Sequence, residues 1–251
     1  MKQLKHKLLK TIKRRIYVPI RNMVATNVKE LDDPFVRYLR YANAGMMTRG
    51  NTYMFDHAVR NLPADSDKYP FVEVGSFAGL STNIFTWLFR KHKREHRFVN
   101  VDGWVLGKPE DAVGESSVKF EEYNRFIKES YIRNVEHFSA GRLPYTFEMF
   151  SDEFFKHWEQ EDKLTGVLGS EIKLGGPIAS AYLDGDHHYD QVRRDFENVD
   201  KHLIPGGFII FDDSYDGSGW EDINRLMGEI KALGRYAVEM QNPNYMFRKL
   251  R

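Results

Sequence analysis

Ionisable side chains follow two apolar segments of the chain at the points where those segments end. They are, in order, Asp184, Asp186, His187, Asp212 and Asp213. In an open α/β sheet, the carboxyl ends of neighbouring strands meet at one ligand crevice, so we expect these side chains to converge. Crowded carboxylates repel one another unless something neutralises them. A hard cation with oxygen ligands, most simply Mg²⁺, would do so, and Asp184, Asp212 and Asp213 are its candidate ligands.

A glycine-rich turn follows an earlier apolar segment. Residues 69–74 run into Gly75 and Gly79, and Ser81 then opens an apolar helical pattern. A turn of this kind lets a ligand approach the backbone N–H groups of a helix N-terminus closely. Phe77 stands where the dinucleotide fingerprint needs its second glycine, and the sequence contains no Walker A motif. The turn therefore predicts a ligand site and argues against NAD, FAD and P-loop nucleotide chemistry.

The elements that must position these residues alternate along the chain. Strands are expected at 69–74, 97–101, 145–150, 179–183, 207–211, 237–241 and 245–249, with helices over 52–61, 81–93, 153–160 and 189–202. The last two strands flank a three-residue turn and must pair antiparallel. Residues 103–142 are polar and aromatic, which predicts a helical lid insertion over a cleft. The expected fold is α/β: a Rossmann-like, doubly wound, seven-stranded sheet with a C-terminal antiparallel hairpin.

Length and composition limit the partners. The chain has 251 residues, a formal net charge of +1 and no cysteine. One α/β domain of this length is ordinary, and thiolate metal sites and disulfides are excluded. The near-zero net charge argues against a nucleic-acid partner. No apolar run approaches the roughly 20 residues that a membrane span needs, and no secretory signal is present, so we expect a cytoplasmic protein.

The first 30 residues differ from the rest, residues 31–251, which form the expected domain. Every charged side chain before Glu30 is basic, and leucine and isoleucine recur among these charges at helical spacing. The pattern predicts a basic amphipathic helix. Two placements stay open: packing against the body or a second subunit of a homo-oligomer, and peripheral contact with an anionic membrane surface.

The segment from Glu73 to Ser81 resembles the first motif of class I S-adenosylmethionine-dependent methyltransferases, especially the catechol-type O-methyltransferases. The resemblance implies that Gly75 and Gly79 lie under the methionine part of the cofactor, with Ser81 in the same motif. It also implies that Glu73 orients the loop or meets the ammonium group of the cofactor.

Two later segments extend this cofactor assignment. The resemblance implies that Asp102, at the end of the second strand, accepts both ribose hydroxyls. Ser151 and Asp152 follow the third strand, where these enzymes usually meet the adenine. This second match is one of position rather than of motif.

The acidic stretch Asp184 to His187, together with the Leu-x-Pro-Gly-Gly run at 203–207, resembles metal-dependent sugar O-methyltransferases of the macrocin and mycinamicin type. In that family, the first aspartate of such a strand end and an acid pair on the next strand hold the metal. The resemblance covers roughly residues 46–214. It implies transfer of a methyl group to a hydroxyl of a sugar, glycoside or related natural product, with Mg²⁺ or another divalent cation assisting.

Methyl transfer to a hydroxyl needs a base, and two residues qualify. His187 is the first choice because an unperturbed imidazole, with a pKa of about 6.5, suits proton transfer at neutral pH. Asp186 is the second, and the sequence does not separate them. Two other functions stay open: a metal-independent or N-directed methyltransferase on the same fold, and a non-catalytic cofactor-binding protein that docks through its basic tail.

Overall fold

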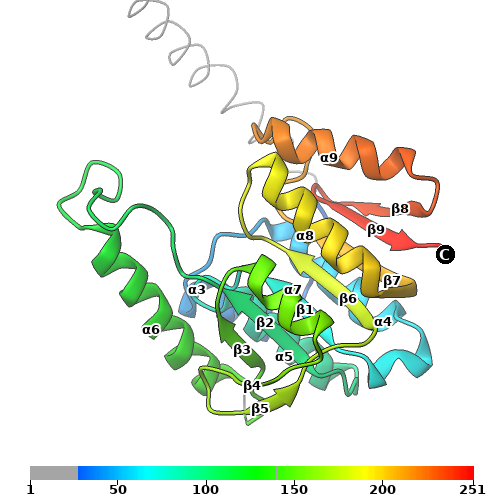
Figure 1. The fold of residues 1–251 in the computed structure, drawn as a ribbon, viewed down its shortest axis with the longest axis horizontal. Helices are drawn as coiled ribbons and strands as arrows, with labels where there is room; N and C mark the ends of the chain where they lie inside the picture. The colour runs from blue at the N-terminus through cyan, green and yellow to red at the C-terminus, as the bar shows by residue number, and fades with distance from the viewer. Residues whose placement is uncertain (1–27, 140) are drawn as a thin grey trace, which may run out of the picture.

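The computed structural model describes residues 28–139 and 141–251 (Figure 1). Its elements in chain order are α3 (Pro34–Ala42), α4 (Arg49–Asn61), the 3₁₀ helix η3 (Ala64–Lys68), β1 (Phe71–Val74), α5 (Leu80–Lys91), β2 (Phe98–Asp102), α6 (Phe120–Phe138), β3 (Tyr145–Glu148), α7 (Ser151–Glu159), β4 (Lys163–Thr165), β5 (Glu171–Lys173), β6 (Ile178–Leu183), α8 (Tyr189–His202), β7 (Leu203–Phe211), α9 (Glu221–Ala232), β8 (Tyr236–Gln241) and β9 (Tyr245–Lys249). Residues 1–27 of the predicted basic tail lie outside the described part of the chain.

One seven-stranded sheet forms the centre of the molecule, in the order β3-β2-β1-β6-β7-β9-β8. The five strands from β3 to β7 are parallel, whereas β9 pairs antiparallel with both β7 and β8. The predicted seven-stranded Rossmann-like sheet with its C-terminal antiparallel hairpin is confirmed. From β1, successive strands are added on one side as β2 and β3 and on the other side as β6 and β7, so the direction of strand addition switches between β1 and β6. Ligands of open α/β sheets bind at such a switch point.

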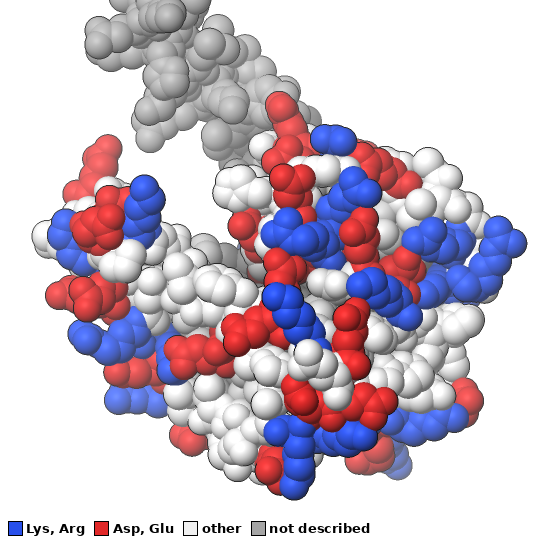
Figure 2. Space-filling model, viewed as in Figure 1, with Lys and Arg blue, Asp and Glu red and all other residues white. Residues whose placement is uncertain are grey.

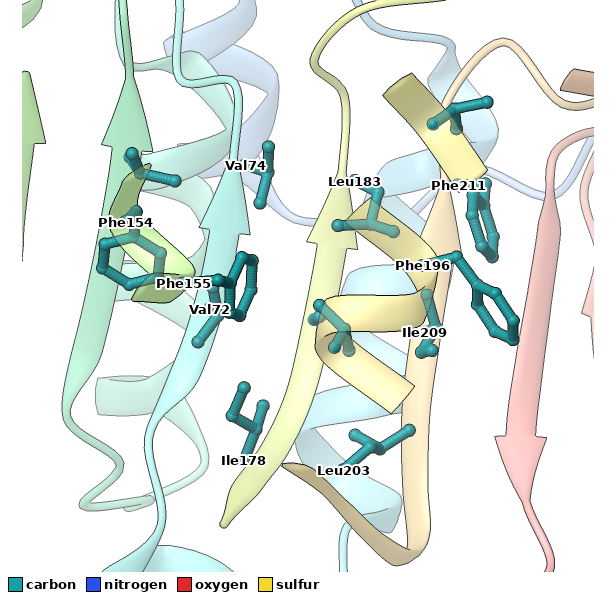
Figure 3. Close-up of a cluster of buried hydrophobic side chains, with 14 of the residues drawn as sticks. Val72, Val74, Phe154, Phe155, Ile178, Leu183, Phe196, Leu203, Ile209 and Phe211 are labelled. Carbon is teal, nitrogen blue, oxygen red and sulfur yellow. The ribbon is translucent and has the colours of Figure 1, made fainter. Parts of the chain in front are cut away.

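Helices cover both faces of the sheet. Helices α7, α8 and α9 lie on one face, where the core contains valine, leucine and isoleucine side chains of β1, β6 and β7 against phenylalanines of α7 and α8 (Figure 3). Helices α3, α4 and α5 supply the core of the opposite face. Burial on both faces explains the continuous apolar run 208–211 of β7 and the complete burial of β1 and β6.

Side-chain alternation decides which face receives each strand-end acid. Phe71 belongs to the core on the α5 side and Val72 to the opposite core, so Glu73 points toward α5. By the same alternation, Tyr182 on β6 lies on the α4 and α5 side. Asp184 and Asp212, each two residues beyond a side chain of that core, continue on the same side. The carboxyl ends of β1, β6 and β7 thus direct acids to one region.

Some elements go beyond the prediction. The hairpin of β4 and β5 was not expected, because strands of three residues are too short to show an alternating pattern. Helices α3 and α9 were not expected either. The lid segment contains α6, as predicted for a helical insertion. Within residues 28–139 and 141–251, no helix combines the length and the apolar character needed to cross a membrane.

Candidate active site

The glycine turn after β1 passes directly beside the end of β6. Gly75 has a φ of +84°, and a Cβ atom there would lie 2.0 Å from the backbone oxygen of Asp184. Gly79 has a φ of +88° at the start of α5, and its Cβ atom would lie 3.1 Å from the side chain of Val135 on α6. Both positions need glycine, since a side chain would be strained and would meet a neighbouring segment. The turn is therefore fitted between β6 and the lid helix.

The lid is attached to the glycine turn. Trp104 is 3% exposed, its indole N–H donates to the backbone oxygen of Phe77 at 2.9 Å, and its ring lies 5.2 Å from that of Tyr131. The side-chain amide of Asn134 donates to the backbone oxygen of Ala78 at 2.9 Å. Trp104 is thus a packing residue of the lid. Farther from this attachment, the lid forms a lobe that an open hollow separates from the body (Figure 2).

Asp102 closes the glycine turn from the end of β2. Its Oδ2 accepts the backbone N–H groups of Ser76 at 2.7 Å and Phe77 at 2.9 Å, and its Oδ1 accepts that of Trp104 at 2.6 Å. Burial raises the pKa of Asp102, although these hydrogen bonds act in the opposite direction. The carboxylate organises the turn, which the sequence did not predict. Oδ1 retains one lone pair for a ligand hydroxyl.

Glu73 lies fully buried between β1 and α5. Its Oε2 accepts the hydroxyl of Thr82 at 2.6 Å and the side-chain amide of Asn100, while Oε1 has no hydrogen-bond partner. Burial raises the pKa of Glu73 to about 7. Ser76 Oγ, in the glycine turn, is also buried without a partner. Two unpaired oxygens beside a turn that only glycine can build fit a cofactor carrying hydrogen-bond donors such as an ammonium group.

The two residues expected near adenine are paired with α8. Ser151, at the start of α7, donates to Asp195 Oδ1 at 2.5 Å, and Asp152 accepts from Arg194 at 3.0 Å. Burial raises the pKa of Asp195 to about 6. Ser81, in the first turn of α5, is buried. The contacts of Ser151 and Asp152 tie α7 to α8, and their adenine assignment stays a prediction.

Two of the predicted acids meet at one hydroxyl group. Tyr182 OH lies 3.0 Å from Asp184 Oδ2 and 2.9 Å from Asp212 Oδ2. Burial, followed by the charges of Asp212 and Asp213, raises the pKa of Asp184 well above its usual value. Burial and the charge of Asp213 likewise raise the pKa of Asp212. The predicted convergence is therefore observed for Asp184 and Asp212, and negative charge accumulates there.

Distant asparagines hold Asp212 in place. Asp212 Oδ1 accepts the side-chain amides of Asn51 on α4, at 2.9 Å, and of Asn244 in the turn between β8 and β9. The two asparagines are also joined to each other at 2.9 Å. Sequence reasoning missed both, because 161 positions separate Asn51 from Asp212 and neither asparagine belongs to a motif.

Asp184, Asp212 and Asp213 offer the oxygen atoms that a cation site needs, but they do not form a complete coordination shell. Within the described residues, the only ion pair of Asp184, Asp212 or Asp213 is the one between His187 and Asp213. Their carboxylate oxygens match the preference of a hard divalent cation. In residues 28–139 and 141–251, however, no three His, Asp or Glu side chains are arranged as metal ligands. The donor set fits a cation in chemistry and charge, and holding one would require these side chains to move closer together.

The two candidate bases face different surroundings. Asp186 is exposed and accepts the backbone N–H of His188 at 2.9 Å and its imidazole at 2.5 Å. Burial would raise the pKa of Asp186, but the hydrogen bonds from His188 outweigh it and lower the pKa. His187 Nε2 is buried without a hydrogen-bond partner, 3.4 Å from Asp213 Oδ2. Of the two candidate bases, only His187 thus directs its side chain toward one of the predicted metal ligands, Asp213.

Comparison with known families decides the assignment. Residues 72–214, from the first parallel strand to the acids after the last, match the family described as "Methyltransferase domain". The chain belongs to this family. It is accordingly an S-adenosylmethionine-dependent methyltransferase, and the matched segment spans the glycine turn, Asp102 and both acidic strand ends.

Individual proteins show the same fold at low identity. The uncharacterized protein R132 of Acanthamoeba polyphaga mimivirus is 24% identical over 205 residues, which cover 79% of this chain and 77% of the viral protein. The O-methyltransferase NovP is 16% identical, with a TM-score of 0.54 and coverage of 84% of both chains. CalS11, the TDP-rhamnose 3'-O-methyltransferase of calicheamicin biosynthesis, is 15% identical, with a TM-score of 0.53 over 92% of this chain and 91% of CalS11. These likenesses concern the fold.

Proposed function

We propose that this methyltransferase transfers the methyl group of S-adenosylmethionine to a hydroxyl oxygen of a sugar, glycoside or related natural product, assisted by Mg²⁺ or another divalent cation. The observation that carries the proposal is the concentration of Asp184, Asp212 and Asp213, which have no Lys or Arg partner among the described residues, beside the buried Nε2 of His187, which makes no hydrogen bond there. CalS11, a sugar O-methyltransferase of similar fold, supports the choice of acceptor class.

The glycine turn and its neighbours would bind the methyl donor. Gly75 and Gly79 allow the turn to fit closely between β6 and the lid helix, and the methionine part would lie beside this turn, with the unpaired Oε1 of Glu73 accepting its ammonium group. Asp102 Oδ1 would accept a ribose hydroxyl. The donor supplies a methyl carbon made electrophilic by the sulfonium. The same turn lies against the backbone of Asp184, which brings the donor site next to the acids.

His187 would remove the proton of the acceptor. As the acceptor oxygen forms its bond to the methyl carbon, the carbon–sulfur bond breaks, the sulfonium becomes a neutral thioether, and Nε2 of His187 takes the hydroxyl proton. The two side-chain nitrogens of a neutral imidazole differ in role, so Nε2 must be the unprotonated one before transfer. Asp213, 3.4 Å away, would stabilise the imidazolium that results.

Asp184, Asp212 and Asp213 would hold the cation. A bound divalent cation lowers the pKa of a coordinated hydroxyl and offsets the crowded negative charge. Asn51 and Asn244 orient Asp212 through its Oδ1, so this residue would offer Oδ2. Tyr182 contacts the facing oxygens of Asp184 and Asp212 and sets their separation.

A metal-independent transferase is a second candidate. It is favoured by one observation: three donors, from Asn51, Asn244 and Tyr182, already satisfy Asp212 in the structure. In that case His187 and Asp213 alone would assist proton removal. Chelation separates the two candidates, because it affects only the first.

The test is a methyl-transfer assay on the full chain with S-adenosylmethionine and a panel of TDP-rhamnose, methyl α-L-rhamnopyranoside and catechol. We expect a methyl ether and S-adenosylhomocysteine, loss of turnover after EDTA treatment, and recovery when Mg²⁺ is added. Turnover that is insensitive to EDTA would favour the metal-independent candidate. Methylation of nitrogen in an aminosugar control, with no ether from any hydroxyl, would overturn the proposed acceptor chemistry.

A further inference from the structure

The loop between β7 and α9 begins at the proposed metal ligands and ends at an exposed tryptophan. Asp213 has a φ of +48°, an unusual value for a residue other than glycine. Ser214 then ties the loop to the C-terminal hairpin: its N–H donates to Asn244 Oδ1 at 3.0 Å, and its hydroxyl oxygen accepts the N–H of Tyr245 at 2.8 Å. The start of the loop is therefore held in place by the same hairpin turn that holds Asp212.

Trp220 closes the loop and turns back toward the acids. It is the N-cap residue of α9, and its backbone N–H donates to Ser218 Oγ at 3.1 Å. Its ring centroid lies 4.3 Å from that of His187, with an interplanar angle of 30°. The two rings are in tilted contact, and Nε2 of this imidazole lies 3.4 Å from Asp213 Oδ2.

The rest of the indole is open to solvent. Trp220 is 43% exposed, whereas Trp104 and Trp158 are nearly fully buried and Trp87 is half-buried. All four tryptophans of the chain lie in the described part. A large exposed aromatic surface next to a candidate base is the kind of surface that small-molecule sites use to orient a ligand.

We propose that Trp220 is the acceptor-binding platform of this enzyme: the exposed part of the indole receives the apolar face of the acceptor sugar, and the contact between the indole and the imidazole places that sugar next to His187. This inference rests on the proposed function and adds the residue that selects the acceptor. A pyranose ring presents a face of C–H groups that packs on an aromatic surface, while its hydroxyls point outward to polar groups. Trp220 and His187 offer those two kinds of contact side by side.

Kinetics of matched variants give the first test. Trp220→Ala is expected to raise KM for TDP-rhamnose about tenfold, which corresponds to about 1.4 kcal/mol, and to leave KM for S-adenosylmethionine within about twofold. Trp220→Phe keeps an aromatic face and should restore KM to within about threefold of the wild type. Leu233→Ala, which shortens a 40% exposed apolar side chain at the other end of α9, is the control and should match the wild type. An unchanged acceptor KM in Trp220→Ala would overturn the proposal.

Nuclear magnetic resonance gives a test that does not need turnover. The S-adenosylhomocysteine complex is titrated with methyl α-L-rhamnopyranoside, which carries no nucleotide that could bind elsewhere, and the four indole N–H signals are followed. The signal absent from Trp220→Phe should move, and those of Trp87 and Trp158 should not. A shift at Trp220 without any methyl transfer would support the platform and contradict the proposed function. Methyl transfer with an unmoved Trp220 signal would contradict the platform alone.

Discussion

The site has two ends. The donor end consists of the glycine turn, Glu73 and Asp102, and the proposed acceptor end consists of Asp184, Asp212, Asp213 and His187. They are stabilised in different ways. At the donor end, Asp102 is satisfied by backbone N–H groups of Ser76, Phe77 and Trp104, so the turn and its acid complete one another. At the acceptor end, Asp212 depends on amides brought from α4 and the C-terminal hairpin. Buried polar atoms without a hydrogen bond among the described residues remain at both ends: Glu73 Oε1 and Ser76 Oγ at the donor end, and His187 Nε2 at the acceptor end.

This difference separates an end whose acid is satisfied by backbone N–H groups from an end whose acids crowd together. Backbone donors are fixed by the fold, so the donor end costs little to organise when the cofactor binds. At the acceptor end, burial and then the charges of neighbouring carboxylates raise the pKa of Asp184, and a bound cation would relieve that repulsion. Changes at the donor end should therefore affect folding, and changes at the acceptor end should affect turnover.

The largest effect is expected where the two ends meet, at Gly75. Gly75→Ala would place a methyl group 2.0 Å from a backbone oxygen that cannot move away, at a φ of +84°. We expect a loss of more than about 4 kcal/mol of unfolding free energy, or no folded protein. Gly114→Ala is the matched control, because its φ of +61° is also positive but nothing lies within 4 Å of the added atom. It should cost only about 1 kcal/mol. Urea denaturation of both variants measures the difference, and equal losses would show that the contact between the two ends is loose.

Asp184→Asn should separate the two ends by function. The amide removes a charge from the acceptor end and leaves the glycine turn in place. We expect turnover to fall about a hundred- to a thousandfold, equivalent to about 3 to 4 kcal/mol of transition-state stabilisation. Calorimetry should show binding of S-adenosylhomocysteine within about threefold of the wild type. A parallel loss of cofactor binding would mean that the two ends are one structural unit.

A smaller, pH-dependent effect is expected from Glu73 at the donor end. Its folded pKa of about 7 exceeds the ordinary 4.5, so the folded state binds more protons than the unfolded state between these values. Stability should fall as pH rises through that window and remain lower above it. Glu73→Gln removes the cost of ionisation, and we expect it to stabilise the protein by roughly 2 to 3 kcal/mol at pH 8 and by little at pH 5.

Denaturation at the two pH values tests this effect, with the exposed Glu115→Gln as control. The control should change stability by the same small amount at both pH values. If Glu73→Gln behaved like the control, the buried carboxyl would carry no penalty. Solvent would then reach the Glu73 carboxyl more easily than its hydrogen bonds indicate.

Much of the framework could be predicted from the sequence. Strands buried on both faces produce apolar runs such as 208–211, and 71–74 is interrupted only by Glu73, so the parallel sheet was recognisable. The short turn before Tyr245 required the antiparallel hairpin. Acids at the ends of β6 and β7 were expected to converge because parallel strands share one carboxyl edge, and Asp184 and Asp212 do so.

The contacts made by residues remote in sequence could not be predicted. Asn51 and Asn244 reach Asp212 only because α4 and the hairpin turn are packed beside β7, which no local pattern reveals. Asp102 was predicted to meet ribose, and its bonds to the glycine turn depend on the conformation of that turn. Trp220 lies 33 positions after His187 in the chain, and their ring contact follows from the path of the loop after β7.

The most direct measurement of the central claim is binding of Mn²⁺, as a spectroscopic substitute for Mg²⁺, to the S-adenosylhomocysteine complex, followed by electron paramagnetic resonance. We predict one Mn²⁺ per chain in the wild type and in Glu115→Gln, and none at the same concentration in Asp184→Asn. Equal binding by Asp184→Asn, or no binding by the wild type, would contradict the account of the acceptor end as a cation site.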